Sequence, residues 1–311
     1  VVDPTANAGN DRIVNQFENV PFNGGASFDD LEITNYTWTF DYNGEPIVMF
    51  GPNPRFQFNV PGVYSVTLKV SDGAGHWDTD IVNITVLDVV KPFADAGPDI
   101  EIDQHETVRF NGTGSSDLVG IINFSWKFSY DDDIVEIFGS QPSFKFDLAG
   151  TFSVILNVSD QAGNWATDVV NVTVWDITPP IALAGDDISI DAGDHGVFDG
   201  SSSFDNVGIV NWTWTFSYDG SDIALYGEIR DFIFEIPGEY LVELLVRDGV
   251  DLTAIDQISI RVNDIFPPFA NAGEDKVVDQ FNEVLLDGTA SRDDVGIVNW
   301  TWEISIRDEV H

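Results

Sequence analysis

A six-residue pattern of alternating polar and large apolar side chains recurs four times in this chain, always 88 residues apart. The third copy, residues 211–216, reads Asn-Trp-Thr-Trp-Thr-Phe, and the others lie at residues 35–40, 123–128 and 299–304. Alternation with a period of two is typical of a β-strand that buries one face. Each copy therefore predicts a half-buried strand whose aromatic row anchors a repeated core.

Each repeat contains about seven short alternating segments, separated by turn residues and without helical periodicity. In the first repeat these segments lie near residues 12–15, 19–23, 35–40, 47–50, 55–58, 64–70 and 82–86. A polar loop is expected at residues 72–80. Seven such strands in one unit predict an all-β fold, a linear array of tandem immunoglobulin-like β-sandwich domains. Propeller blades and solenoid repeats are shorter than this unit.

The period divides the 311 residues into three complete units and part of a fourth. The predicted domains are residues 1–88, 89–176, 177–264 and 265–311. We expect residues 265–311 to be the first half of a repeat, truncated or completed by residues outside this segment. A half-sandwich would expose its core face and unpaired strand edges. The sequence therefore predicts an interior segment of a longer array, with anchor and targeting signals elsewhere.

Two motifs flank the aromatic strand. Residues 201–205 read Ser-Ser-Ser-Phe-Asp, and residues 62–72 read Gly-Val-Tyr-Ser-Val-Thr-Leu-Lys-Val-Ser-Asp, with equivalents at 150–160 and 238–248. With these motifs the repeats resemble PKD (polycystic kidney disease) domains over the whole chain, and are similar to tandem PKD repeats of archaeal cell-surface proteins. The family's usual Trp-Asp-Phe-Gly-Asp-Gly turn is replaced, at residues 38–44, by Trp-Thr-Phe-Asp-Tyr-Asn-Gly. The resemblance implies an extracellular, non-catalytic module used in surface layers, adhesins and spacers of secreted enzymes.

The formal net charge of −40 excludes some partners. Such a surface repels nucleic acid and anionic membranes, and it favours divalent cations, high ionic strength or a strongly hydrated surface. The chain has no cysteine, so no disulfide framework supports the domains. No apolar run approaches the ~20 residues that a membrane-spanning helix needs, so we expect no membrane span in this segment.

The chain carries eight Asn-X-Ser/Thr sequons, which are acceptors for N-linked glycans in secreted proteins. They are Asn35, Asn83, Asn111, Asn123, Asn157, Asn171, Asn211 and Asn299. Six fall on outward positions of predicted strands, four of them at the same repeat position. The same residues would also serve as polar filler on a solvated face, but we expect glycans on several of them.

Aspartates recur in register around the predicted loops and linkers. Two loops of a sandwich and the linker from the preceding domain share one end, so Asp88, Asp117, Asp160 and Asp168 are expected to converge. Clustered carboxylates suit Ca²⁺, which takes 6–8 oxygen ligands. The candidate calcium ligands are Asp88, Asp117, Asp160, Asp168, Asp176, Asp205, Asp248, Asp256, Asp264 and Asp293. Asp is also a favoured turn residue that bonds its own backbone, so a purely structural role stays open.

No catalytic constellation is recognisable in the sequence. The four histidines occupy unrelated repeat positions, and there is no cysteine, nucleophile elbow, zinc-protease helix or phosphate loop. Trp77 and Trp165 are expected in exposed loops. They would stack on sugars or, as we favour, pack against the linker prolines Pro92 and Pro180. We therefore expect no enzyme activity.

These observations favour a non-catalytic structural repeat segment of a glycosylated extracellular or cell-surface protein, in a surface layer, stalk or filament. The alternatives are an adhesin or carbohydrate-binding array, and a spacer of a secreted hydrolase. Expected partners are further copies of the chain or other surface proteins, with carbohydrate as a further candidate. Short linkers rich in proline or β-branched residues predict a semi-rigid rod whose junctions are stiffened by calcium.

Overall fold

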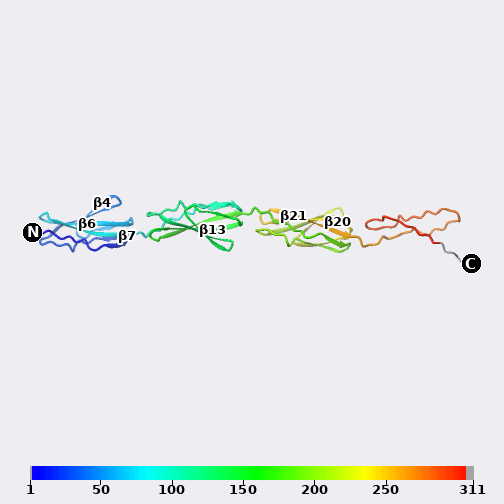
Figure 1. Ribbon diagram of the computed structural model, residues 1–311, viewed down its shortest axis with the longest axis horizontal. Helices are drawn as coiled ribbons and strands as arrows, with labels where there is room; N and C mark the ends of the chain where they lie inside the picture. Colours follow the sequence, from blue (N-terminus) through cyan, green and yellow to red (C-terminus); the bar gives the residue numbers. More distant parts are fainter. Residues whose placement is uncertain (1, 306–311) are drawn as a thin grey trace. The chain divides into compact units, whose positions relative to one another are not determined.

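The computed structural model describes residues 2–305, and every regular element in this part of the chain is a β-strand. Figure 1 shows the strands coloured along the chain. The chain divides into two compact units, Val1–Trp175 and Asp176–His311. The first contains two sandwich domains, and the second contains a third domain followed by residues 265–305. No helix among the described residues is long and apolar enough to cross a membrane.

Each domain has seven strands, and their order is the same in all three. The first domain contains β1 (Arg12–Asn15), β2 (Asn19–Pro21), β3 (Ile33–Tyr42), β4 (Glu45–Phe50), β5 (Arg55–Gln57), β6 (Gly62–Asp72) and β7 (Trp77–Leu87). The second contains β8 (Ile100–Asp103), β9 (Thr107–Arg109), β10 (Ile121–Tyr130), β11 (Asp133–Phe138), β12 (Ser143–Lys145), β13 (Gly150–Asp160) and β14 (Trp165–Trp175). The third contains β15 (Ile188–Asp191), β16 (His195–Asp199), β17 (Ile209–Tyr218), β18 (Ser221–Tyr226), β19 (Ile229–Ile233), β20 (Gly238–Asp248) and β21 (Thr253–Asn263).

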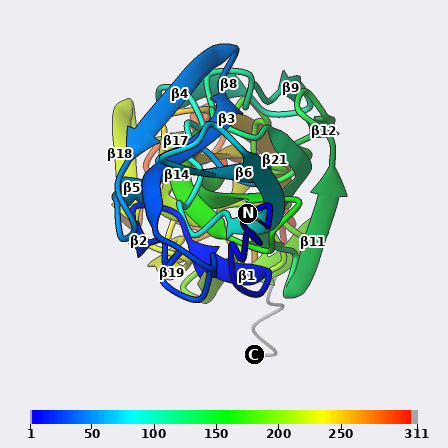
Figure 2. The same ribbon diagram turned by 90° about the vertical axis from the view of Figure 1, so that its left-hand side faces the viewer.

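A five-stranded and a two-stranded sheet form each sandwich. In the first domain the larger sheet has the order β1-β7-β6-β3-β4, and β2 pairs with β5 in the smaller one. Strand β1 runs parallel to β7, whereas the other neighbours are antiparallel. Figure 2 shows this domain in the foreground, with β1 and β4 at opposite edges of the larger sheet. The predicted immunoglobulin-like sandwich is confirmed.

A tryptophan in the third strand of each domain lies at the centre of the core. Trp38, Trp126 and Trp214 are fully buried. The indole N–H of Trp38 donates a hydrogen bond to the carbonyl of Gly51 at 3.1 Å, and the other two tryptophans make the equivalent bond. A buried N–H without a partner would cost free energy, so this bond allows the polar end of the ring into the core.

A glycine allows the chain to pass directly over this tryptophan. A Cβ atom at Gly112 would lie 3.1 Å from Cζ2 of Trp126 and 3.2 Å from Cδ1 of Phe124. The same close approach occurs in the first domain at Gly24 and in the third at Gly200. The aromatic strand and the loop before it are therefore packed with little room for a side chain.

A tyrosine closes the corner that leads into the sixth strand. The hydroxyl of Tyr64 donates to the carbonyl of Val60 at 2.8 Å, and Tyr240 makes the same bond to Ile236. This arrangement is the tyrosine corner of immunoglobulin-like sandwiches. The second domain has Phe152 at this position, which packs against Phe146 at a centroid distance of 5.2 Å.

The structure corrects two predictions of local structure. The expected loop at residues 72–80 is limited to residues 73–76, because β6 and β7 pair up to Ser71 and Trp77. Residues 299–304 do not form the predicted strand. In the three domains the aromatic strand pairs with the sixth strand, and residues 265–305 contain no such partner. Their one β-bridge joins Phe269 to Arg292, and Trp302 remains 41% exposed.

Replacing the central tryptophan is expected to destabilise its domain. Trp126→Ala removes a fully buried ring and leaves a cavity, which should lower the free energy of unfolding of the second domain by roughly 3–5 kcal/mol. Chemical denaturation of the full chain measures this. Trp165→Ala is the matched control, because Trp165 is 52% exposed. Equal losses in the two variants would contradict the proposed core.

Candidate functional site

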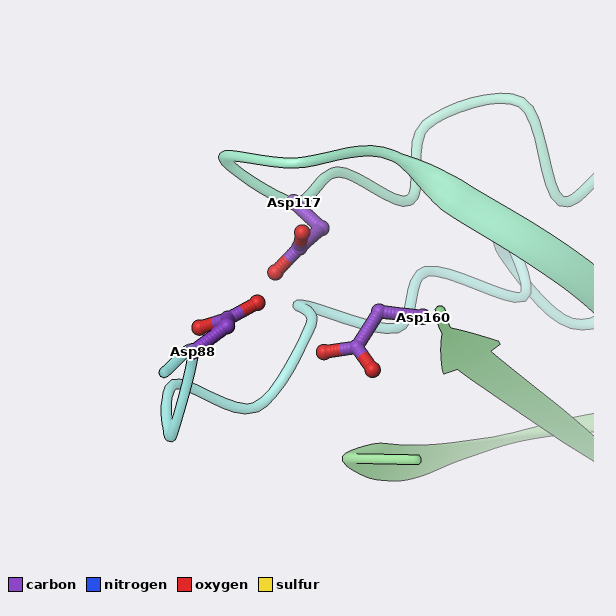
Figure 3. A group of neighbouring side chains, drawn as sticks. All are labelled: Asp88, Asp117 and Asp160. Atoms are coloured by element: carbon purple, nitrogen blue, oxygen red, sulfur yellow. The ribbon is translucent and has the colours of Figure 1, made fainter. Parts of the chain in front are cut away.

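Three groups of aspartates bring carboxylate oxygens together. Within each group one oxygen from each residue lies within 4.8 Å of the others. The groups are Asp88, Asp117 and Asp160; Asp176, Asp205 and Asp248; and Asp264, Asp293 and Asp294. Figure 3 shows the first group, in which three carboxylates from separate segments point toward a common space. These oxygen clusters are the arrangement that could hold a hard divalent cation.

The fold positions each member of the second domain's group. Asp88 follows directly after β7, Asp160 is the last residue of β13, and Asp117 precedes β10. A β-bridge between Phe93 and Ser116 holds the linker against the loop that carries Asp117. Its two backbone hydrogen bonds measure 2.8 and 2.9 Å. The equivalent bridge in the third domain joins Ile181 to Phe204. Strand pairing and one bridge therefore bring three distant aspartates together.

Each aspartate of the third domain's group uses one oxygen to stabilise its own turn. Asp176 Oδ1 accepts from the Thr178 amide and from Asn206 Nδ2. Asp205 Oδ2 accepts from the amides of residues 207 and 208, and Asp248 Oδ1 from those of residues 250 and 252. The second oxygens, Asp176 Oδ2, Asp205 Oδ1 and Asp248 Oδ2, are buried and accept no hydrogen bond. One oxygen of each carboxylate therefore has hydrogen-bond partners, and the other oxygen has none.

The residue four positions after the buried aspartate differs between the domains. In the second domain Asn164 donates from Nδ2 to Asp160 Oδ2 at 2.8 Å. In the first domain His76 Nδ1 lies 2.9 Å from Asp72 Oδ2. The third domain has Leu252 at this place, which carries no donor in its side chain. The Oδ2 atom of Asp248 consequently has no hydrogen-bond partner, whereas the Oδ2 atoms of Asp160 and Asp72 each have one.

The buried aspartates that end the sixth strands of the first two domains, Asp72 and Asp160, have a lowered pKa. Burial, the largest effect, raises the pKa of Asp160, but hydrogen bonds from Asn164 and nearby amides together outweigh it and leave that pKa below its ordinary value. The pKa of Asp72 is lowered chiefly by its hydrogen bond with the His76 ring. The same bond, and the attraction of the Asp72 charge, raises the pKa of His76. Both aspartates are therefore anionic at neutral pH.

Two of the expected calcium ligands lie outside these groups. Asp168 Oδ2 accepts a hydrogen bond from the Ala96 amide, and Asp256 Oδ2 from the Ala184 amide, each at 2.8 Å. These aspartates hold the opening segment of each domain against its last strand. The expected convergence therefore includes Asp88, Asp117 and Asp160 without Asp168. Sequence reasoning missed Asp294, whose only signal was its position next to Asp293.

The eight sequons fall into two sets by exposure. Five asparagines are exposed. Asn35, Asn123 and Asn211 lie at the predicted outward position of β3, β10 and β17, Asn111 lies in the loop after β9, and Asn299 lies in the last segment. The half-buried ones are Asn83, Asn157 and Asn171. Nδ2 of Asn83 donates to Asp11 at 3.2 Å, and Nδ2 of Asn171 donates to Asp99. At these two sites the nitrogen that would carry a glycan is bonded to an aspartate of another segment, whereas Nδ2 of Asn35 donates to Thr37 of its own sequon at 3.2 Å.

Trp77 and Trp165 are exposed, but they begin β7 and β14 instead of lying in loops. The Nζ atom of Lys69 lies 4.4 Å from the centroid of the Trp77 ring, and that of Lys91 lies 5.3 Å from the Trp165 ring. Such cation–π contacts cover a ring face with a charged group. Trp165 is therefore contacted by Lys91, the linker residue next to Pro92. The lysine covers one of the two ring faces on which a sugar could stack.

Comparison with known proteins identifies the family. The PKD domain family matches residues 1–86, 89–174 and 177–262, so this chain belongs to the PKD domain family. Its relatives include the human dyslexia-associated protein KIAA0319, 31% identical over 307 residues, and the mouse homolog, 30% identical over 306 residues. Each alignment covers 92% of this chain and 28% of the relative. The chain thus spans under a third of the length of these relatives.

Solved structures give a more distant similarity. The complex of Dpr2 Ig1-Ig2 with DIP-Theta Ig1-Ig3 is 12% identical, with a TM-score of 0.41. The match covers 85% of this chain and 100% of that one. This similarity is too low to add to the family assignment.

The pair of Asp72 and His76 is expected to make the stability of the first domain depend on pH. Because the folded state raises the His76 pKa, this contribution is fully present below the ordinary histidine pKa of about 6.5 and is lost as pH rises through the folded value. His76→Asn copies the second domain and should remove this part of the pH dependence. Thermal unfolding of both proteins between pH 6 and 9 measures it. Parallel curves would contradict the role of His76.

Proposed function

We propose that this chain is a non-catalytic structural segment of a glycosylated extracellular or cell-surface protein, in a surface layer, stalk or filament. The observation that carries this proposal is the repetition of one PKD sandwich, with the same strand order and the same tryptophan core in each domain. Regular repetition of a scaffold provides length and spacing, because each unit adds the same increment to the chain.

Surface charge supports an environment of high ionic strength or free divalent cations. The chain has 53 acidic residues against 13 basic ones. Such an excess keeps the surface hydrated, but it also repels itself and so destabilises the compact state unless counter-ions screen it. A glycosylated exterior fits the same picture, since the sequon asparagines of β3, β10 and β17 are exposed. The exposed third-strand position is where we place the main glycans.

A specific observation favours binding to other surface proteins as a second function. The edge strands β4, β11 and β18 each end in an exposed aromatic residue at the same repeat position. These residues are Phe50, Phe138 and Tyr226, which are 70%, 64% and 63% exposed. An exposed aromatic ring at the same position of each domain would suit an adhesin, because aromatic side chains contribute strongly to protein interfaces. The third candidate, a spacer of a secreted hydrolase, would require a catalytic domain in the full-length gene.

Native material is expected to carry glycans on Asn35, Asn123 and Asn211. These asparagines are exposed, whereas Asn83 and Asn171 are half-buried with their amide nitrogens bonded to Asp11 and Asp99. Mass spectrometry of intact glycopeptides should therefore find higher occupancy at the first three sites. Unmodified peptides at all three would refute the glycan assignment.

Electron microscopy tests the structural function. Native cells or secreted material, labelled with antibodies raised against this chain, should show it in a regular lattice, stalk or fibre. Label found only on dispersed monomers would contradict the proposal. Binding to a purified surface protein that is lost in a Phe50→Ser, Phe138→Ser, Tyr226→Ser variant would instead support the adhesin. A glycan array without binding would remove the carbohydrate-binding candidate.

A further inference from the structure

We infer that Asp176, Asp205 and Asp248 form a Ca²⁺ site at the entrance of the third domain, which ties the linker residue Asp176 to two loops of the domain that follows it. This inference goes beyond the proposed function and does not depend on it. It depends on the geometry of the three carboxylates and on the buried oxygens that they leave without partners.

The turn-forming role of aspartate explains only one oxygen of each carboxylate. Asp248 is 1% exposed, and its Oδ1 atom accepts two backbone hydrogen bonds of 2.9 Å. Its Oδ2 atom is buried and accepts no hydrogen bond. The carboxylate of Asp248 lies close to those of Asp176 and Asp205. Buried polar atoms are nearly always paired, and an unpaired carboxylate oxygen is especially costly. Three such oxygens in one group therefore call for a positively charged ligand.

The spacing of the oxygens fits a single ion. Calcium binds oxygens at 2.3–2.6 Å, so two oxygens on one ion are separated by at most about 5.2 Å. One oxygen from each of the three carboxylates lies within 4.8 Å of the others. Three carboxylates supply three of the 6–8 ligands, and water or backbone carbonyls would complete the shell. The divalent charge would offset most of the mutual repulsion of three anions.

The third domain is the strongest candidate for a Ca²⁺ site, because the side chain of Leu252 cannot donate a hydrogen bond to Asp248 Oδ2. In the second domain the equivalent residue, Asn164, donates a hydrogen bond to Asp160 Oδ2, although Asp88 Oδ2 and Asp117 Oδ1 remain buried without partners. We therefore expect the second domain to bind the ion more weakly. Among the described residues of the group of Asp264, Asp293 and Asp294, no buried oxygen lacks a partner, and we place no site there.

Because Asp176 lies in the linker, a bound ion would also affect how the linker is held. Asp176 directly follows Trp175, the last residue of β14, so a bound ion would hold the chain where it leaves one domain and enters the next. Asp205 lies in the loop before β17, and Asp248 ends β20. Calcium would thus fasten three segments that no disulfide joins. Its removal should loosen the linker first and lower the stability of the third domain.

Calorimetric titration of the chelator-treated full chain with CaCl₂, in 150 mM NaCl and excess MgCl₂, tests the site. Wild type should bind Ca²⁺ in a saturable manner. Asp248→Asn should bind one ion fewer per chain, or bind that ion at least tenfold more weakly. The asparagine Oδ1 atom can still accept the two backbone hydrogen bonds, so the domain should fold. Circular dichroism checks this.

Two further variants separate a specific site from the general attraction of an acidic surface. Asp186→Asn makes the same charge change at an exposed aspartate outside the group and should leave binding unchanged. Leu252→Asn keeps all carboxylates but adds the donor found in the second domain, and should weaken binding. The inference is overturned if wild type shows no saturable binding, if Asp248→Asn keeps the full stoichiometry and affinity, or if Asp186→Asn reduces binding equally.

Discussion

The buried tryptophan of the third strand is the interaction on which each domain depends. Its ring fills the space between the two sheets, and its indole N–H reaches the carbonyl of a glycine thirteen residues later, as from Trp126 to Gly139. Phe110 stacks on the same ring at a centroid distance of 5.0 Å. The glycine at 112 lets the chain cross it. A domain without cysteine thus obtains its rigidity from one close-packed aromatic cluster that recurs every 88 residues.

Aspartates perform a second task, which is to fasten the segments that the strands leave loose. Asp80, Asp168 and Asp256 accept hydrogen bonds from the opening segment of their domains, across 72 residues of sequence. Asp117 and Asp205 hold the loop before the aromatic strand through two backbone amides each. The acidity of the chain is therefore partly structural. This explains why the same aspartate positions recur although the surrounding surface residues vary.

Much of the fold could be predicted because it depends on local alternation. The aromatic strands of three repeats, the sixth strands and the sandwich class follow from side chains that alternate between core and solvent. The errors have physical causes. Trp77 begins β7 because pairing with β6 extends the strand through residues whose polarity indicated a loop. Residues 299–304 carry the right alternation, but the described residues 265–305 include no strand that pairs with them as the sixth strand does in the three domains.

The sequence by itself determined the repeat, the inward aromatic row and the aspartates available to the domain entrances, because these are properties of residue type and spacing. Only the tertiary structure decided which aspartates meet and which oxygens remain unpaired. Asp168 and Asp160 are eight residues apart and look alike in the sequence. One holds a backbone amide of the opening segment, and the other joins Asp88 and Asp117. That difference depends on strand register and loop conformation, which bring together residues far apart in the chain.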